Sequence, residues 1–276
     1  MDSAHAWKGY YRAEREWLGA AALVEFLDVA EPLDARAGGA IVIPHTRLEV
    51  TGGQIAAAAA TVVASGVDRV LALGVLHGAR RRDRARVTAA RSGNEGARRE
   101  LRGVHDERGL AAEEFSLDGF TELLALAAER AGTTVDVVRR YPFLVGDDPD
   151  SLPGLDELSR IVADGAMLVV TTDPVHHGRA YDTPESQCMP ADDPATLATA
   201  QRMVDEQFSA LSEHRFDDFV DLAERHRSDF RDTGPTMAAL IGAGWEATVH
   251  ELELVDYSAA LDSPSPSWVA GALVTL

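Results

Sequence analysis

The chain has 276 residues, of which 46% are hydrophobic and 26% charged, with 23 glycines and 12 prolines. This composition excludes collagen-like and compositionally disordered proteins and is typical of a folded globular protein. The net charge of −19 is spread along the chain. It argues against nucleic acid and anionic membranes as main partners, because both bind basic surfaces.

The cysteine content and the N-terminal segment bear on the compartment. Cys188 is the only cysteine, which excludes an intramolecular disulfide, a cysteine-based zinc finger and a cysteine-ligated iron–sulfur cluster. The first residues lack the apolar core of a signal peptide, and the longest apolar run, the alanine tract after Gln54, is too short to cross a bilayer. We therefore expect a cytoplasmic protein without a membrane segment.

The first two predicted strands both end at a histidine. Residues 39–43 form a β-branched apolar run that stops at Pro44 and is followed by His45. After a predicted break at residues 51–53, residues 54–65 read as a helix that Gly66 closes. Residues 69–77 repeat the first pattern and end in His77. This order predicts a βαβ unit with two histidines at corresponding strand ends.

The alternation of strands and helices continues along the chain. The arginine-rich residues 80–102 read as a solvated loop with broken helix. A third apolar strand, 167–173, ends in Asp173 and runs directly into His176 and His177. The remaining predicted elements are helices at 116–132, 155–163, 195–213, 216–227 and 234–242 and strands at 135–145, 249–254 and 268–276.

These elements predict an α/β fold with a central, mostly parallel or mixed sheet flanked by helices. No Pro/Ser-rich stretch is long enough to separate two domains. We expect one domain over residues 1–276, with residues 1–37 as an N-terminal extension packed on it.

Histidines at three strand ends are the main chemical signal in the sequence. His45, His77 and His176 each follow a buried strand, and the carboxyl ends of parallel strands meet at one edge of a sheet. Neutral imidazole is a common ligand for iron, zinc, copper and nickel. The pattern predicts a metal site at this edge.

Other catalytic motifs are absent from the sequence. There is no Walker A lysine motif, and no GxGxxG follows the first or second strand, which disfavours nucleotide chemistry. There is also no GxSxG nucleophile elbow, so acyl transfer by a serine triad has no support.

Six segments in order and spacing resemble the Memo family, which is related in fold to the class III extradiol dioxygenases. They lie within residues 38–276 and are 43–45, 51–53, 72–77, 141–146, 170–178 and 269–273. The resemblance implies that fold and metal ligands at His45, His77 and His176, from the family's PHAGY, GPSH and SDxxH motifs. The family's fourth ligand is a cysteine before a glycine, and Thr233 occupies that place here.

The sequence departs from the family pattern in the pocket. The family's EHSxE pattern reads EFSLD at residues 114–118, without its histidine, and the tyrosine expected after PHAG is replaced within residues 46–48.

The place of the fourth ligand differs as well. Asp232 stands beside Thr233, and the dioxygenase relatives use a carboxylate from the corresponding region. We expect His45, His77 and Asp232 to form the two-histidine, one-carboxylate triad of non-haem Fe(II) oxygenases; the alternative for Asp232 is a helix N-cap. His176 would then be a third ligand or an acid/base.

Side chains around this triad are assigned supporting roles. Asp173 is expected to orient an imidazole or carry a proton together with His176. Arg47 could offer a guanidinium fork to a substrate carboxylate, with a surface arginine as the alternative reading. His177 is a candidate for contact with the substrate.

The sequence thus predicts a non-haem Fe(II)-dependent oxygenase that acts with O2 on a small organic substrate in bacterial specialised metabolism. Cu and Zn are the alternative metals. A zinc-type hydrolase and a non-catalytic metal-binding or scaffold protein are the alternative functions. The substrate and the oligomeric state, including a homodimer, stay open.

Overall fold

Strands and helices alternate along the chain in the computed structural model, which describes residues 4–35, 38–78, 83–144 and 148–276. The helices are α1 (Ala4–Val29), α2 (Leu48–Ser65), α3 (Arg84–Arg91), α4 (Glu95–Leu101), α5 (Asp118–Ala131), α6 (Leu155–Ala163), α7 (Pro194–Ser212), α8 (Phe216–Arg225) and α9 (Phe230–Ile241), with short 3-10 turns η1 (Arg179–Tyr181) and η2 (Glu185–Gln187). The strands are β1 (Ala40–Ile43), β2 (Arg69–Leu73), β3 (Gly103–His105), β4 (Asp136–Phe143), β5 (Met167–Thr171), β6 (Val175–Gly178), β7 (Thr248–Asp256) and β8 (Ser267–Thr275).

The strands form one mixed sheet of eight strands in the order β3-β4-β2-β5-β1-β8-β6, with β7 also paired to β8. The four central strands β4, β2, β5 and β1 are mutually parallel, and the outer pairings are antiparallel. β5 lies between β1 and β2, so the first two strands run in the same direction without touching. The carboxyl ends of β2, β5 and β1 therefore lie side by side.

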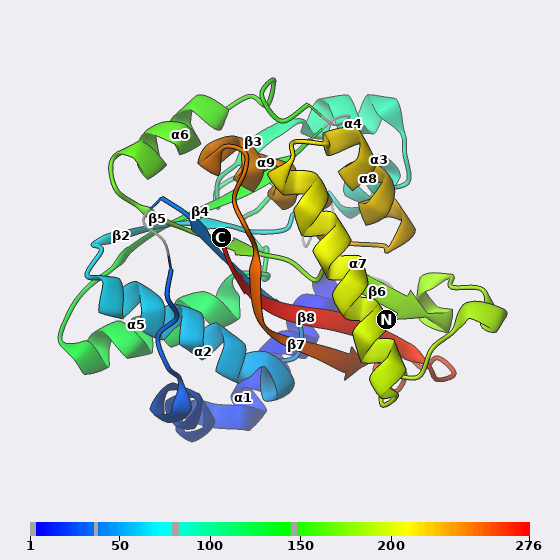
Figure 1. The fold of residues 1–276 in the computed structure, drawn as a ribbon, viewed down its shortest axis with the longest axis horizontal. Coiled ribbons are helices and arrows are strands. Elements are labelled where there is room, and N and C mark those ends of the chain that lie inside the picture. The colour runs from blue at the N-terminus through cyan, green and yellow to red at the C-terminus, as the bar shows by residue number, and fades with distance from the viewer. Residues whose placement is uncertain (1–3, 36–37, 79–82, 145–147) are drawn as a thin grey trace.

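Helices cover both faces of the sheet (Figure 1). Helices α1, α2 and α5 pack on one face, and α6, α7, α8 and α9 on the other. Successive strand residues alternate between the two layers, as the pleat requires: Ile41 belongs to the first core and Val42 to the second. This confirms the predicted α/β fold with a mixed sheet flanked by helices.

Helix α2 runs through the predicted break at residues 51–53. It begins at Leu48 and includes Gly52 and Gly53. A Cβ at Gly52 would lie 2.4 Å from the ring of Phe26 in α1. The glycine is thus needed for close approach of two helices, not for a turn. Gly66 does end the helix, in the left-handed conformation with φ 72°, as predicted.

Other predicted boundaries also differ from those in the structure: the predicted strand 69–77, for example, ends at Leu73. α9 begins at Phe230, four residues before the predicted start, and accommodates Pro235 in its interior. Residues 80–102, predicted as a loop with broken helix, contain two short helices, α3 and α4, while 79–82 lie outside the described residues. The predicted strand 135–145 ends at Phe143, and its last residue also lies outside them.

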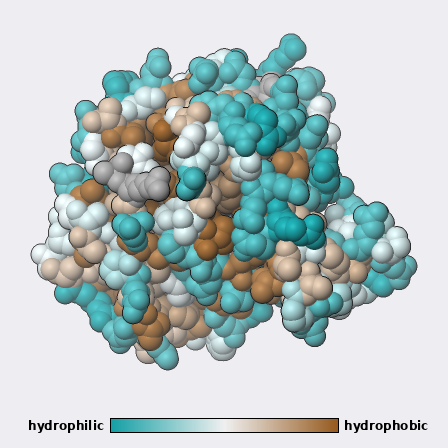
Figure 2. All heavy atoms as spheres, in the orientation of Figure 1, coloured by the Kyte–Doolittle hydropathy of each residue, from teal (hydrophilic) through white to brown (hydrophobic). Residues whose placement is uncertain are grey.

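α2 is long and apolar enough to cross a membrane by length and composition alone. However, 61% of it is buried inside the protein, between the sheet and α1. This burial is typical of a core helix. The exposed face shown in Figure 2 is largely hydrophilic over α7, with apolar residues scattered elsewhere.

Candidate metal centre

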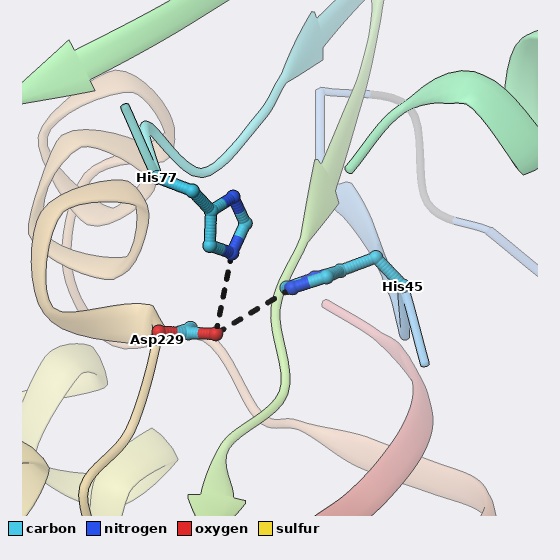
Figure 3. A group of neighbouring side chains, drawn as sticks. All are labelled: His45, His77 and Asp229. Carbon is cyan, nitrogen blue, oxygen red and sulfur yellow. Dashed lines mark ion pairs between the residues drawn. The ribbon is translucent and has the colours of Figure 1, made fainter. Parts of the chain in front are cut away.

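Two strand-end histidines point at one carboxylate. His45 follows β1 and His77 follows β2, and the two rings lie 5.2 Å apart between centroids. The Nε2 atom of His45 is 3.5 Å, and that of His77 3.6 Å, from Oδ2 of Asp229 (Figure 3). The three ligand atoms all lie within 4.8 Å of one another. These residues form a group that could hold a metal ion.

The spacing within this group suits a metal better than a direct hydrogen bond. Contacts of 3.5 and 3.6 Å exceed the usual N–H···O distance of about 2.7–3.2 Å. Two ligands about 2.1 Å from one shared ion lie roughly 3.0–3.4 Å apart. The donor set of two imidazoles and one carboxylate therefore fits a metal ion with small adjustments.

The start of α9 presents Asp229 to the histidines. Asp229 is the N-cap residue of α9, yet its side chain makes no capping hydrogen bond. Instead, the hydroxyl of Ser228 accepts the N–H of Phe230. The backbone N–H of Asp229 donates to the carbonyl of Asp173 at 3.1 Å, which ties the helix start to the end of β5. The carboxylate is thus left available to the imidazoles.

Neighbouring side chains hold both rings by their other nitrogen. Nδ1 of His77 lies 3.2 Å from Oε2 of Glu114, whose Oε1 accepts the backbone N–H of Gly78 at 2.7 Å. Phe115 stacks on the same ring, with centroids 4.6 Å apart. Nδ1 of His45 lies 3.2 Å from the hydroxyl of Thr171. Such contacts fix the direction in which Nε2 points, as is typical of metal-ligating histidines.

A second group of potential ligands shares the same aspartate. Asp173, His176 and Asp229 also have ligand atoms within 4.8 Å of one another. Nε2 of His176 lies 3.7 Å from Oδ2 of Asp229. Asp173 accepts the backbone N–H of His45 through Oδ1, and its Oδ2 lies 3.6 Å from Nε2 of that histidine. Three imidazoles thus surround one carboxylate.

The charges within the cluster shift its pKa values in opposite directions. Burial acts to raise the pKa of Asp229, but His176, His45 and His77 together hold it well below its usual range. Burial acts to lower the pKa of His77, but Asp229 and Glu114 raise it to about 9. Without a metal, the cluster therefore binds protons in place of a cation.

The pKa of Asp173 shifts in the opposite direction from that of Asp229. Its pKa is raised, chiefly by desolvation and also by the charge of Asp229, and is only partly offset by His45 and His176. A carboxyl group with a raised pKa can hold and release a proton near the neighbouring ligands.

Asp232, the carboxylate predicted from sequence, belongs to neither group. Its Oδ1 accepts the backbone N–H of Leu144 at 3.0 Å and lies 3.7 Å from Nη1 of Arg231. Thr233 is buried, and its hydroxyl donates to the carbonyl of Thr171 at 3.5 Å. One helical turn separates the predicted carboxylate from Asp229, the residue that meets the histidines. The structure thus brings Asp229, and not the predicted Asp232, to the histidines.

The structure places the two predicted substrate contacts in other surroundings. Arg47 makes ion pairs with Glu14 and Glu49. The ring of His177 stacks on Trp268 at 4.7 Å, and its Nε2 accepts the backbone N–H of Met189. Neither side chain is a member of the two metal-binding groups.

Sequence reasoning missed Asp229 and Glu114, although each left a signal. Asp229 follows Ser228 and precedes a helix, which is an N-cap pattern, but the late predicted start of that helix hid it. Glu114 opens the segment that resembles the family's EHSxE pattern. That segment was interpreted only for its missing histidine.

Neither a scan against protein-family models nor a search of curated proteins finds a match for this sequence.

Proposed function

We propose that this protein is a non-haem Fe(II)-dependent oxygenase that acts with O2 on a small organic substrate. The observation that carries the proposal is the convergence of His45, His77 and Asp229. Two histidines and one carboxylate with open coordination positions are the ligand set of this enzyme class, and some zinc hydrolases share it. The six Memo-like segments support a place for the chain in that family, because three of them supply His45, His77 and His176.

In this proposal each residue has a defined task. His45, His77 and Asp229 would hold the iron, which would supply a binding site for O2 and substrate and redox chemistry between them. Glu114 and Phe115 fix the plane of His77, as their contacts with its ring show. Thr171 fixes His45 in the same way.

Two further residues handle protons. His176 presents Nε2 to the cluster, and its Nδ1 is buried with no hydrogen-bond partner among the described residues. Asp173, with its raised pKa, takes up or releases a proton at Oδ2, the oxygen that lies 3.6 Å from Nε2 of His45. We assign acid/base work to this pair, and His176 is also placed to complete the ligand set.

Metal content is the first test of this proposal. Protein purified without oxygen is analysed for metals and then titrated with Fe(II) under argon, in the wild type and in His45→Ala and His77→Ala. We expect about one iron per chain, as one triad requires, and loss of binding in both variants, which stay folded by circular dichroism. O2 uptake in the presence of candidate substrates then follows.

Other outcomes would replace the proposal. Retention of zinc in preference to iron would support a metal-dependent hydrolase, and preferred binding of copper would make a copper site the better account. No metal binding at all would contradict the catalytic proposal and favour a non-catalytic scaffold.

A further inference from the structure

A cavity of about 440 Å³ opens onto Asp229 from the side of α3, α4 and α8. Its volume is within the range of small-molecule sites. Three arginines line it, Arg98, Arg227 and Arg231, together with the apolar side chains of Ala90, Phe143 and Ala223. The carboxylates of Glu224, Asp229 and Asp232 also line the cavity, and Asp229 connects it to the metal-binding group.

The arginines of this cavity are poorly neutralised by the protein. Glu224 is shared between two of them: its Oε1 lies 3.8 Å from Nη2 of Arg98 and 3.7 Å from Nε of Arg231. The Glu224 side chain is more than half exposed, so these pairs are weak. No ion pair involves Arg227 within the part of the chain that the structure describes.

Arg231 carries the sharpest sign of a missing partner. Its side chain is only 13% exposed, and its Nε is buried without a hydrogen bond to any described residue. Its second acidic neighbour, Asp232, lies 3.7 Å away and is also held by the N–H of Leu144. A buried guanidinium N–H without an acceptor is costly, and Nε is the donor of Arg231 for which no acceptor is found among the described residues. An oxyanion in the cavity would provide one.

We propose that this cavity binds a small organic oxyanion, with its carboxylate or phosphate at Arg98, Arg227 and Arg231 and an apolar body against Phe143. Guanidinium groups suit both anions, because their N–H donors match two oxygens at once. Arginines without close carboxylate partners are also unexpected in a chain with a net charge of −19. The inference rests on the proposed function for its meaning as a substrate site, because the opposite end of the ligand would reach Asp229.

The test uses three ring compounds of similar size and the metal-free full-length protein. Benzoate and phenyl phosphate carry the anion, and benzamide is the neutral control. Binding is measured by calorimetry and by ligand-observed NMR. We expect at least one anion to bind about tenfold or more tightly than benzamide and to weaken with added salt. A higher affinity for benzoate would indicate a carboxylate site, and a higher affinity for phenyl phosphate would indicate a phosphate site.

Glutamine variants locate the binding. Arg98→Gln and Arg231→Gln are expected to weaken anion binding about tenfold or more, and the exposed Arg227→Gln by about threefold. Arg215→Gln is the matched control, because Arg215 also has two acidic neighbours, Glu213 and Asp218, but lies outside this cavity. Arg227→Gln keeps the test valid if a variant of a buried arginine fails to fold.

The variants test anion binding and iron binding separately. His45→Ala is expected to lose iron but keep anion binding, and Arg227→Gln to keep stoichiometric iron. Equal binding of benzamide and the anions, no binding of any of the three, or anion binding unchanged in the cavity variants would overturn the inference. Anion binding in a protein that takes up no iron would leave the anion site standing and contradict only the proposed function.

Discussion

The two sides of the start of α9 carry two aspartates with different surroundings. Asp229 faces the ends of β1, β2 and β6, where three imidazoles lie 3.5–3.7 Å from its Oδ2. Asp232, one turn later, faces the end of β4, where it accepts the N–H of Leu144 and pairs with Arg231. The two aspartates are close together in the sequence, but only the carboxylate of Asp229 lies beside the histidines.

The difference shows how a structural carboxylate is distinguished from a ligand. The acceptor capacity of Asp232 is used by a backbone N–H and an arginine, as a stable buried acid requires. Asp229 stands where a capping residue would, yet leaves the cap to Ser228 and faces titratable nitrogens at more than hydrogen-bond distance. The Asp229 carboxylate in these surroundings would gain a direct ligand bond when a cation binds.

The largest expected effect separates these two aspartates. Asp229→Asn should weaken Fe(II) binding by at least a hundredfold, because it removes the only anionic member of the first group. Asp232→Asn should leave iron affinity within about threefold but lower the free energy of unfolding by about 1–2 kcal/mol, through its hydrogen bond to Leu144. Anaerobic iron titrations and urea unfolding measure the two effects. Equal loss of iron in both variants would erase the distinction.

A second test changes His77 through its contact with Glu114. Glu114→Gln removes the charge that fixes the Nδ1 proton of the ring, and loss of such an outer contact typically costs about 10–100-fold in metal affinity. The same variant should lower the pKa of His77 from its value of about 9. Histidine NMR and metal titration give both numbers. Unchanged affinity would show that Glu114 does not position the ring.

The raised pKa of His77 predicts how metal affinity and stability depend on pH. Coordination needs the neutral ring, so below pH 9 the metal must displace a proton from His77, and Co(II) affinity should rise about tenfold per pH unit between 6.5 and 8.5. In the metal-free protein the raised pKa stabilises the fold fully below the unfolded value of 6.5, and this stabilisation is lost as the pH rises through 9. Co(II) titrations and urea unfolding across this range check both trends; a flat affinity profile would contradict them.

The smallest expected effect on metal binding comes from a change in the packing of α1 on α2. Gly52→Ala places a Cβ 2.4 Å from the ring of Phe26 and should destabilise the packing of α1 on α2 by about 1–3 kcal/mol. Iron stoichiometry should stay at the wild-type value. Urea unfolding and iron titration provide the measurements, and an undiminished stability would show that α1 simply shifts to make room.

Much of the fold could be predicted because its signals are local. The apolar runs of β1, β2 and β5 and the left-handed glycines after α2 and α5 mark their elements without tertiary information. The short strand β6 and the continuation of α2 through Gly52 could not be predicted in this way. Both depend on packing partners distant in sequence, β8 and α1.

The histidines of the candidate site were within reach of sequence reasoning, but the carboxylate was not. Parallel strands bring their carboxyl ends together, so His45 and His77 could be paired from strand order alone. The choice between Asp229 and Asp232 depends on where α9 begins and how it rotates. The resemblance favours Asp232 because it stands beside Thr233, the counterpart of the family's cysteine, whereas the carboxylate beside the histidines lies almost one turn earlier, at Asp229.

A crystal structure of the iron-loaded protein, with anomalous data collected at the iron edge, tests the central claim most directly. The account predicts one anomalous peak bounded by Nε2 of His45, Nε2 of His77 and a carboxylate oxygen of Asp229. A peak at Asp232, or iron bound away from these histidines, would contradict it.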